Sequence, residues 1–252
     1  MADLNRKPTT TIGDFGALDD GRSVHAVTLA NARGATAVVL TLGASLHALT
    51  ARGRDGAFAD IIVAPATLAG YRASRSYFGA TVGRYANRIA GARLAIDDRD
   101  YRLDANEGAN TLHGGALGFD QLVWAISETN AAEDSASVTL LLDSPDGDQG
   151  FPGAVTATAT YTLHTEDELS VEYRAITNKP TVINLSNHAY FNLGGEGGAI
   201  SAMDHLLTIS ANKFTPVDAT LIPTAALEDV TGTPFDFRAP TRVGARIRHH
   251  HH

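Results

Sequence analysis

The chain has 252 residues, a formal net charge of −8 and no cysteine. This length fits one large all-β or α/β-barrel domain, although two smaller domains would also fit. The negative charge provides no overall basic field, so we expect neither nucleic acid nor a membrane as a partner. Without cysteine, the chain can have no disulfide, no thiolate nucleophile and no cysteine-ligated metal.

The chain begins with a polar segment and ends with a run of histidines. Residues 1–8 lack the apolar segment of a signal peptide, and no later stretch is long and apolar enough to span a bilayer. We therefore expect a soluble, cytoplasmic protein. Residues 249–252 are four histidines, which we interpret as a purification tag or its remnant and exclude from the fold. A natural metal-binding tail and a native sequence that continues past a histidine-rich turn are the alternatives.

Alternation with a period of two residues runs along most of the chain. In residues 155–163, apolar side chains alternate strictly with threonines, and after a polar corner the alternation resumes at 169–175. This pattern predicts an antiparallel hairpin with one buried face. In chain order, the other predicted strands are 23–28, 37–42, 46–51, 61–63, 93–96, 101–103, 123–128, 137–142, 181–186 and 206–210. One short helical turn is predicted at 68–71, after Pro65.

The fold class follows from these elements. Many short strands separated by Gly, Asp and Asn, with no sustained helical period, predict an all-β sandwich or barrel. No linker or low-complexity tract divides the sequence, so we expect residues 1–248 to form a single domain.

Three segments combine polar side chains with glycine, at residues 83–89, 110–115 and 184–195. Together they could provide directional donors and acceptors for a ligand that carries several hydroxyl groups. Each segment alone also has a structural interpretation. Arg84 and Arg88 would form ion pairs, His113 would cap a turn, and His188 would be a hydrogen-bonded core histidine.

Motifs of other functional classes are missing. The sequence has no phosphate-binding P-loop, no HExxH zinc motif, no dinucleotide-binding fingerprint and no nucleophile elbow around a serine. No third histidine has metal-ligand spacing to His113 or His188. We therefore expect no metal and no cofactor.

Taken together, the polar segments give the chain a family resemblance. From about Phe15 to Arg246 it resembles the aldose 1-epimerase (galactose mutarotase) family, and five blocks carry the resemblance: 78–89, 110–115, 146–153, 187–194 and 233–238. The resemblance implies a large antiparallel β-sandwich of the galactose mutarotase-like supersandwich type, in a monomer or homodimer. It also implies an isomerase that interconverts the α- and β-anomers of hexoses such as glucose and galactose, without a cofactor.

The resemblance also assigns roles to individual residues. Asn87 and Arg88 correspond to the pair that binds sugar hydroxyls, and His113 to a histidine near the ring oxygen. His188 corresponds to the general acid, and Tyr190 helps to line the site. Histidine suits an acid that protonates the ring oxygen, because its ordinary pKa is about 6.5. A base on the other side would take the proton of the C1 hydroxyl.

We also predict where these side chains lie. Arg88 and His113 are expected to share one concave site on the open face of the sandwich. His188 is expected at the end of a rigid strand over 181–186, whereas His113 is expected on a looser turn beside two glycines.

The sequence departs from the family pattern after residue 238. The family's substrate-binding Asp and catalytic Glu do not occur in the remaining residues, so we expect a sandwich that lacks its C-terminal strands. The expected result is a site that binds sugar but catalyses poorly. If the chain is nevertheless active, Asp236, Glu107 and Asp120 are the candidates for another base.

Two other functions remain open. The same blocks could serve a non-catalytic carbohydrate-binding sandwich, because a fold does not fix a function. A hexose-phosphate 1-epimerase would need a cluster of cationic side chains for the phosphate, and Arg84 and Arg88 alone make a weak cluster.

Overall fold

The computed structural model describes residues 6–73, 75–195, 200–224 and 226–247, so the histidine tail predicted at 249–252 lies outside the described residues. The chain divides into two compact units, Met1–Tyr190 and Phe191–His252. Each is described by itself, and a single domain over 1–248 stays a prediction. No helix in the described part of the chain is both long and apolar enough to cross a membrane.

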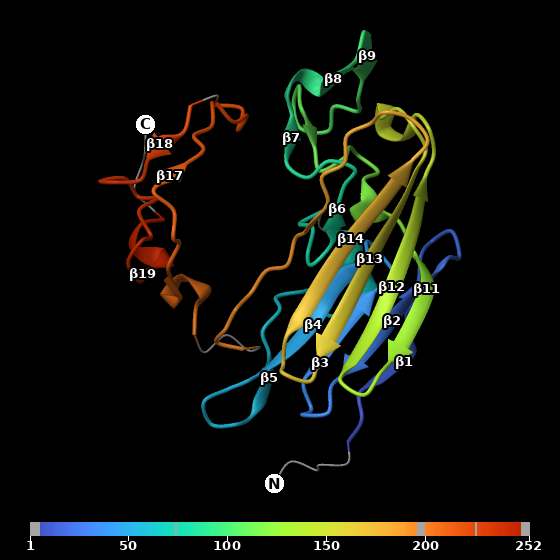
Figure 1. Ribbon diagram of the computed structural model, residues 1–252, viewed down its shortest axis with the longest axis vertical. Coiled ribbons are helices and arrows are strands. Elements are labelled where there is room, and N and C mark those ends of the chain that lie inside the picture. Colours follow the sequence, from blue (N-terminus) through green and yellow to red (C-terminus); the bar gives the residue numbers. More distant parts are fainter. Residues whose placement is uncertain (1–5, 74, 196–199, 225, 248–252) are drawn as a thin grey trace. The chain divides into compact units, whose positions relative to one another are not determined.

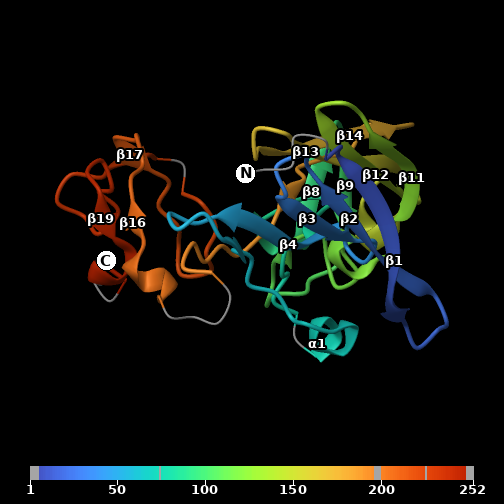
Figure 2. The ribbon, with the colours of Figure 1, turned by 90° about the horizontal axis from the view of Figure 1, so that it is seen from below.

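The first unit is built on two antiparallel sheets that lie face to face as two layers (Figures 1 and 2). The first sheet has the order β1-β2-β3-β4-β5, with strands Thr9–Ala17, Ser23–Ala30, Thr36–Leu40, Ser45–Arg52 and Phe58–Asp60. The second sheet has the order β11-β12-β13-β14, with strands Ala125–Ala131, Ser135–Ser144, Val155–His164 and Leu169–Thr177.

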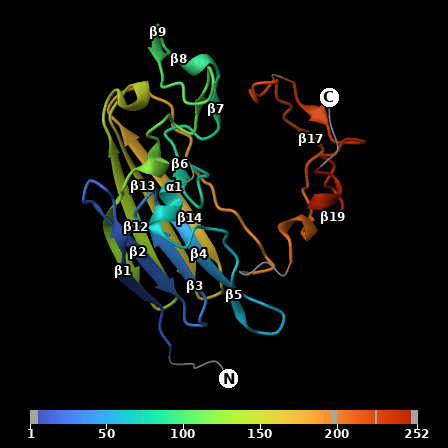
Figure 3. The same cartoon turned by 180° about the vertical axis from the view of Figure 1, so that it is seen from behind.

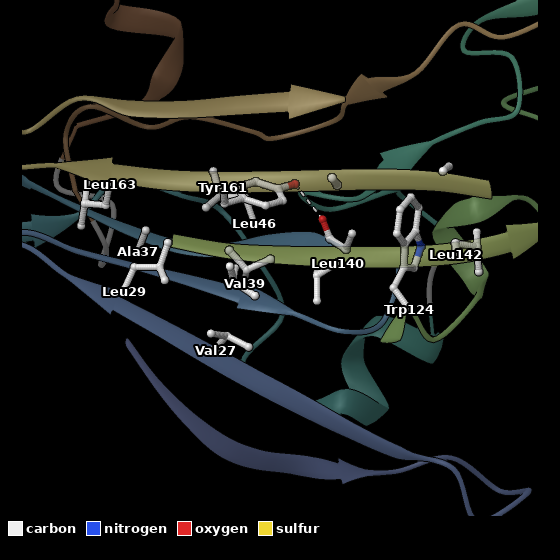
Figure 4. Close-up of a cluster of buried hydrophobic side chains, with 14 of the residues drawn as sticks. Val27, Leu29, Ala37, Val39, Leu46, Trp124, Leu140, Leu142, Tyr161 and Leu163 are labelled. Atoms are coloured by element: carbon white, nitrogen blue, oxygen red, sulfur yellow. Dashed lines mark hydrogen bonds between the residues drawn. The ribbon is translucent and has the colours of Figure 1, made fainter. Parts of the chain in front are cut away.

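The core lies between these two sheets and follows from the alternation in the sequence. Every second residue of β13 is buried, beginning with Val155, and β12 shows the complementary pattern. Side chains of both layers meet in one cluster around Trp124 and Tyr161 (Figure 4). The threonine face of β13 is half-buried, and Thr160 shares a hydrogen bond with Thr139 across the ladder, 3.0 Å between hydroxyl oxygens.

Short elements complete the first unit. Helix α1 (Leu68–Ala73) packs Leu68 against Val24 and Leu40 on the other face of the first sheet (Figure 3). Two-residue ladders join β6 (Thr81–Val82) to β15 (Ser186–Asn187), and β7 (Arg88–Ile89) to β10 (Thr111–Leu112). A hairpin of β8 (Arg93–Ile96) and β9 (Arg99–Arg102) lies beyond one end of the large sheets (Figure 1).

The second unit has little buried surface. It contains two ladders, β16 (Leu206–Leu207) with β19 (Thr241–Arg242) and β17 (Lys213–Phe214) with β18 (Glu228–Asp229). Gly195 and Val230 are the buried residues among those that the structure describes in this unit.

The structure confirms the all-β antiparallel sandwich and the predicted hairpin, in which Leu163 pairs with Leu169. Three strand predictions were wrong in extent. Residues 61–63 form no strand. Of the strand predicted at 181–186, only Ser186 lies in a strand, β15. Of the strand predicted at 206–210, only the two residues of β16 do. Apolar character alone does not make a strand without a partner ladder, and β15 finds only the two residues of β6. Strand β1 was missed because Gly13 and Gly16 interrupt its alternation.

Candidate active site

The pairing of β7 with β10 brings two of the predicted site segments together. Arg88 pairs with Leu112 in this ladder, so Asn87 and His113 face each other at its end. The backbone N–H of His113 donates to the Asn87 carbonyl at 3.0 Å, and the Asn87 N–H donates to Nδ1 of the His113 ring at 3.0 Å. The predicted neighbourhood of Arg88 and His113 is present, while the concave shape of the site stays a prediction.

The contact with the Asn87 amide fixes the protonation of His113. Because Nδ1 accepts a hydrogen bond, the neutral ring carries its proton on Nε2, which is then a donor. Burial, together with the nearby His188 ring, lowers the pKa of His113 to about 4. His113 is therefore neutral at pH 7 and acts there as a hydrogen-bond donor rather than as an acid.

The turn that carries His113 is tight, which corrects the prediction of a looser one. A Cβ at Gly114 would lie 1.8 Å from the Gly83 carbonyl oxygen. The Phe119 N–H also donates to this carbonyl at 3.1 Å, so main chains from three segments meet here. Only glycine fits, because any side chain would overlap the neighbouring main chain.

His188 follows the two-residue strand β15 directly. Its N–H donates to the Ala80 carbonyl at 2.8 Å, and its carbonyl accepts from the Gly79 N–H at 3.1 Å. The Asn187 amide donates to the Gly79 carbonyl at 2.8 Å and to the buried Tyr161 hydroxyl at 2.9 Å. The predicted strand was too long, but an ordered main chain does hold His188 on both sides.

The rings of the two histidines lie side by side in one aromatic group. The His113 and His188 centroids are 5.3 Å apart and the rings are nearly perpendicular, at 88°. Tyr190 is 5.1 Å from His188, and Tyr77 contacts both histidines, at 4.7 Å from His113 and 5.5 Å from His188. Sequence reasoning named three of these residues and missed Tyr77, which lies just before the first family block.

Arg88 and Arg75 are both held by carboxylates. Arg88 donates through Nε and Nη2 to the two oxygens of Glu107, at 2.5 and 2.7 Å, and through Nη1 to Asn87 Oδ1 at 3.1 Å. Arg75 donates to both oxygens of Asp120, at 3.2 and 3.3 Å. The structural interpretation of Arg88 as an ion-paired residue is thus correct, and two of its five N–H groups have no partner among the residues that the structure describes.

These ion pairs make the alternative bases poor ones. The hydrogen bonds from Arg88 lower the pKa of Glu107, and those from Arg238 lower the pKa of Asp236 to about 2. A carboxylate with a low pKa is a weak base. Asp120 has only 1% of its side chain exposed and is held by Arg75, so a substrate hydroxyl cannot reach it freely.

Arg84 has a structural role and corrects the prediction that it forms an ion pair. It is 1% exposed and donates to the carbonyls of Ser144, Pro145, Pro152 and Gly153, and to the Ser144 hydroxyl. It therefore ties the chain before Asn87 to the loop between β12 and β13.

Comparison with known proteins adds an independent result. The family model described as aldose 1-epimerase matches residues 25–251. Over 191 residues, 76% of the chain, the sequence is 42% identical to galactose mutarotase of Rattus norvegicus, and this covers 54% of that protein. It is 39% identical to aldose 1-epimerase of Escherichia coli K12 over 228 residues, 90% of this chain and 64% of that one.

A crystal structure of galactose 1-epimerase from Lactobacillus acidophilus NCFM shares the fold. It superposes with a TM-score of 0.85 at 32% identity, covering 96% of this chain and 69% of the other. The chain spans between 54% and 64% of the length of the two curated relatives. Since the family model covers most of its residues, the chain belongs to the aldose 1-epimerase family.

Proposed function

We propose that the protein is a mutarotase that interconverts the α- and β-anomers of a neutral hexose such as galactose or glucose. The observation that carries this proposal is the pair of histidine rings, 5.3 Å apart, beside the Asn87–Arg88 pair. The names of the relatives, galactose mutarotase and aldose 1-epimerase, support the same reaction.

In this proposal the two histidines have different tasks. His188 gives a proton to the ring oxygen as the C1–O5 bond breaks, while a base takes the proton of the C1 hydroxyl to form the open-chain aldehyde. Rotation about C1–C2 and reclosure then deliver the other anomer, and the protons return. His113, neutral with its proton on Nε2, donates a hydrogen bond to a neighbouring sugar oxygen. Arg88 and Asn87 bind further hydroxyls.

In this scheme Glu107, Asp120 and Asp236 do not serve as the base, because all three are held in ion pairs. The same pairing argues against a phosphorylated substrate. The guanidinium groups of Arg75 and Arg88, which act electrostatically on His113, are already balanced by carboxylates, so they add little net positive charge for a phosphate.

The test separates binding from turnover. Galactose is titrated into the wild-type chain and into His188→Asn and Arg88→Met, and the mutarotation of freshly dissolved α-galactose is followed by polarimetry. We expect wild-type binding that Arg88→Met weakens by about tenfold or more, as for loss of a charged hydrogen-bond donor. Where the chain turns over sugar, His188→Asn should lower the rate by about 10²-fold.

The outcomes distinguish the proposed functions. Saturable galactose binding without any rate above the buffer would favour the carbohydrate-binding alternative for this chain. No galactose or glucose binding at all would refute both. Tighter binding of galactose 6-phosphate than of galactose would contradict the preference for a neutral hexose.

A further inference from the structure

We propose that Tyr77 is a positioning residue that holds the rings of His113 and His188 at their mutual angle, and that the Arg75–Asp120 ion pair holds Tyr77 in place. This inference deepens the proposed function and rests on it for the identity of the ligand. The contacts that carry it are all within the first unit.

The Tyr77 ring contacts the rings of both histidines. It meets His113 edge-on, at 4.7 Å and 69°, and lies tilted against His188, at 5.5 Å and 34°. His113 and His188 contact each other at 88°. Each ring therefore touches the other two, so moving Tyr77 would remove a ring contact from both histidines at once.

The backbone of Tyr77 has an unusual conformation. Its φ is +56°, in the left-handed region that is sparsely populated by aromatic residues. Such a conformation persists only when the surroundings impose it, and it is found most often at functional sites. The strained backbone thus needs contacts that hold the ring in place.

An ion pair between Arg75 and Asp120 lies next to the Tyr77 ring. The Arg75 guanidinium carbon lies 5.3 Å from the Tyr77 ring centroid, in the range of a cation–π contact. Arg75 is fixed in turn by the Asp120 carboxylate and by the Gly115 carbonyl at 2.7 Å. Gln121 also donates to Asp120, at 2.6 Å. The Arg75–Asp120 ion pair is therefore also hydrogen-bonded to the glycine turn that carries His113.

The charges around the histidines define a readout that does not depend on catalysis. His113 is surrounded by His188, Asp120, Arg88 and Arg75, and Glu107 also lies near it. Burial is the main reason that the pKa of His113 is about 4. If Tyr77 is removed, water should reach the His113 ring and its pKa should return toward the ordinary value.

The experiment follows the imidazole nitrogens of His113 and His188 by NMR during a pH titration of ¹⁵N-labelled full chain, with and without galactose. We expect Tyr77→Leu to raise the pKa of His113 by about one unit or more and to weaken galactose binding by about tenfold. Tyr77→Phe keeps the ring and should preserve both values. The double variant Arg75→Gln/Asp120→Asn removes the ion pair next to Tyr77 without leaving a buried charge unpaired. We expect it to change the His113 titration and the galactose binding in the same direction as Tyr77→Leu.

The matched control is Arg72→Gln, since Arg72 is an exposed arginine three residues earlier that pairs with Asp19. It should leave the titration and the binding unchanged. The proposal is overturned if Tyr77→Leu and the double variant fold and titrate as the wild type does. It is also overturned if Tyr77→Phe behaves like Tyr77→Leu, because the hydroxyl and not the ring would then be responsible. Failure of the wild type to bind galactose would refute the proposed function alone, because the titration needs no sugar.

Discussion

At the scale of single residues, His113 shows how a local contact gives one side chain a defined chemical state. Sequence reasoning assigned it to a sugar site through the family resemblance, and the ladder of β7 with β10 places it beside Arg88. Its neutral form could not be predicted, because it depends on the amide of Asn87, 26 residues away, and on burial next to His188. Tyr77 was missed for a similar reason, since no sequence pattern predicts that a tyrosine adopts a left-handed backbone conformation.

The first prediction concerns the pH dependence of stability through His113. Its pKa is about 4 in the folded chain, below the unfolded value of about 6.5, so between these pH values the unfolded chain binds more protons. Stability should therefore fall as the pH drops from 6.5 to 4. Allowing for the partial exposure of the ring, we expect a loss of about 1–2 kcal/mol.

This loss can be assigned to His113 by measuring the free energy of unfolding in urea for the wild type and for His113→Gln, each at pH 7 and pH 4.5. The variant should lose less stability over this interval than the wild type. Equal losses in both proteins would show that the fold does not keep His113 neutral.

The second prediction concerns the Arg88–Glu107 pair. Glu107→Gln removes the negative charge and one of the two acceptor oxygens that fix the Arg88 guanidinium, so galactose binding should weaken by about three- to tenfold. The stability cost should stay below about 1 kcal/mol, because this pair is partly exposed. Calorimetric titration measures the affinity. Glu172→Gln, which breaks the exposed pair with Arg174 on β14, is the control and should change nothing. Unchanged affinity in Glu107→Gln would mean that Asn87 alone orients Arg88.

At the scale of elements, strands with an uninterrupted alternation were predictable, whereas β1, whose alternation is interrupted by glycines, and the two-residue strands of the site were not. The alternation of β12 and β13 specifies which face is buried, and the ladder between them runs in register from Ser135 to Ser144. The strands that carry the site, β6, β7, β10 and β15, have two residues each, too few for a periodic pattern. Their positions depend on contacts such as those of Arg84, which no local pattern encodes.

The third prediction tests Arg84 as a link between elements. Arg84→Leu removes the donor to the carbonyls of three buried residues, Ser144, Pro152 and Gly153. We expect the free energy of unfolding to fall by about 3 kcal/mol or more, measured in urea. The exposed Arg174→Leu on β14 should cost much less. A small effect of Arg84→Leu would show that water replaces the guanidinium.

At the scale of the whole molecule, the two units differ in how much they bury. The first unit has a continuous core between two sheets, whereas the described residues of the second unit are nearly all exposed or half-buried. The all-β class followed from the sequence, because alternation and turn residues recur along the chain. The boundary between the units at Tyr190 could not be predicted from the sequence. The residues around it do not have the composition of a linker, and they lie inside the motif that carries His188.

The fourth prediction follows from this difference. Amide hydrogens of β12 and β13 should exchange slowly, while those of 200–224 and 226–247 should exchange faster by several orders of magnitude, because few contacts protect them. Hydrogen-exchange mass spectrometry with peptide resolution measures both. Equal protection in the two parts would support the single domain expected over 1–248.

The hydrogen bond from the Asn87 amide to His113 also affects how the site tolerates mutation. Its donor belongs to the main chain, so changes of the residue 87 side chain leave the donor in place, proline excepted. Proline is unsuited to this position, because the φ of residue 87 is +66° and the proline ring requires a negative φ. Substitutions at residue 87 therefore change the side chain that meets a ligand. They leave the tautomer of the neighbouring His113 unchanged. For the proposed mutarotase, this means that sugar preference can change through residue 87 while the proton of His113 stays on Nε2.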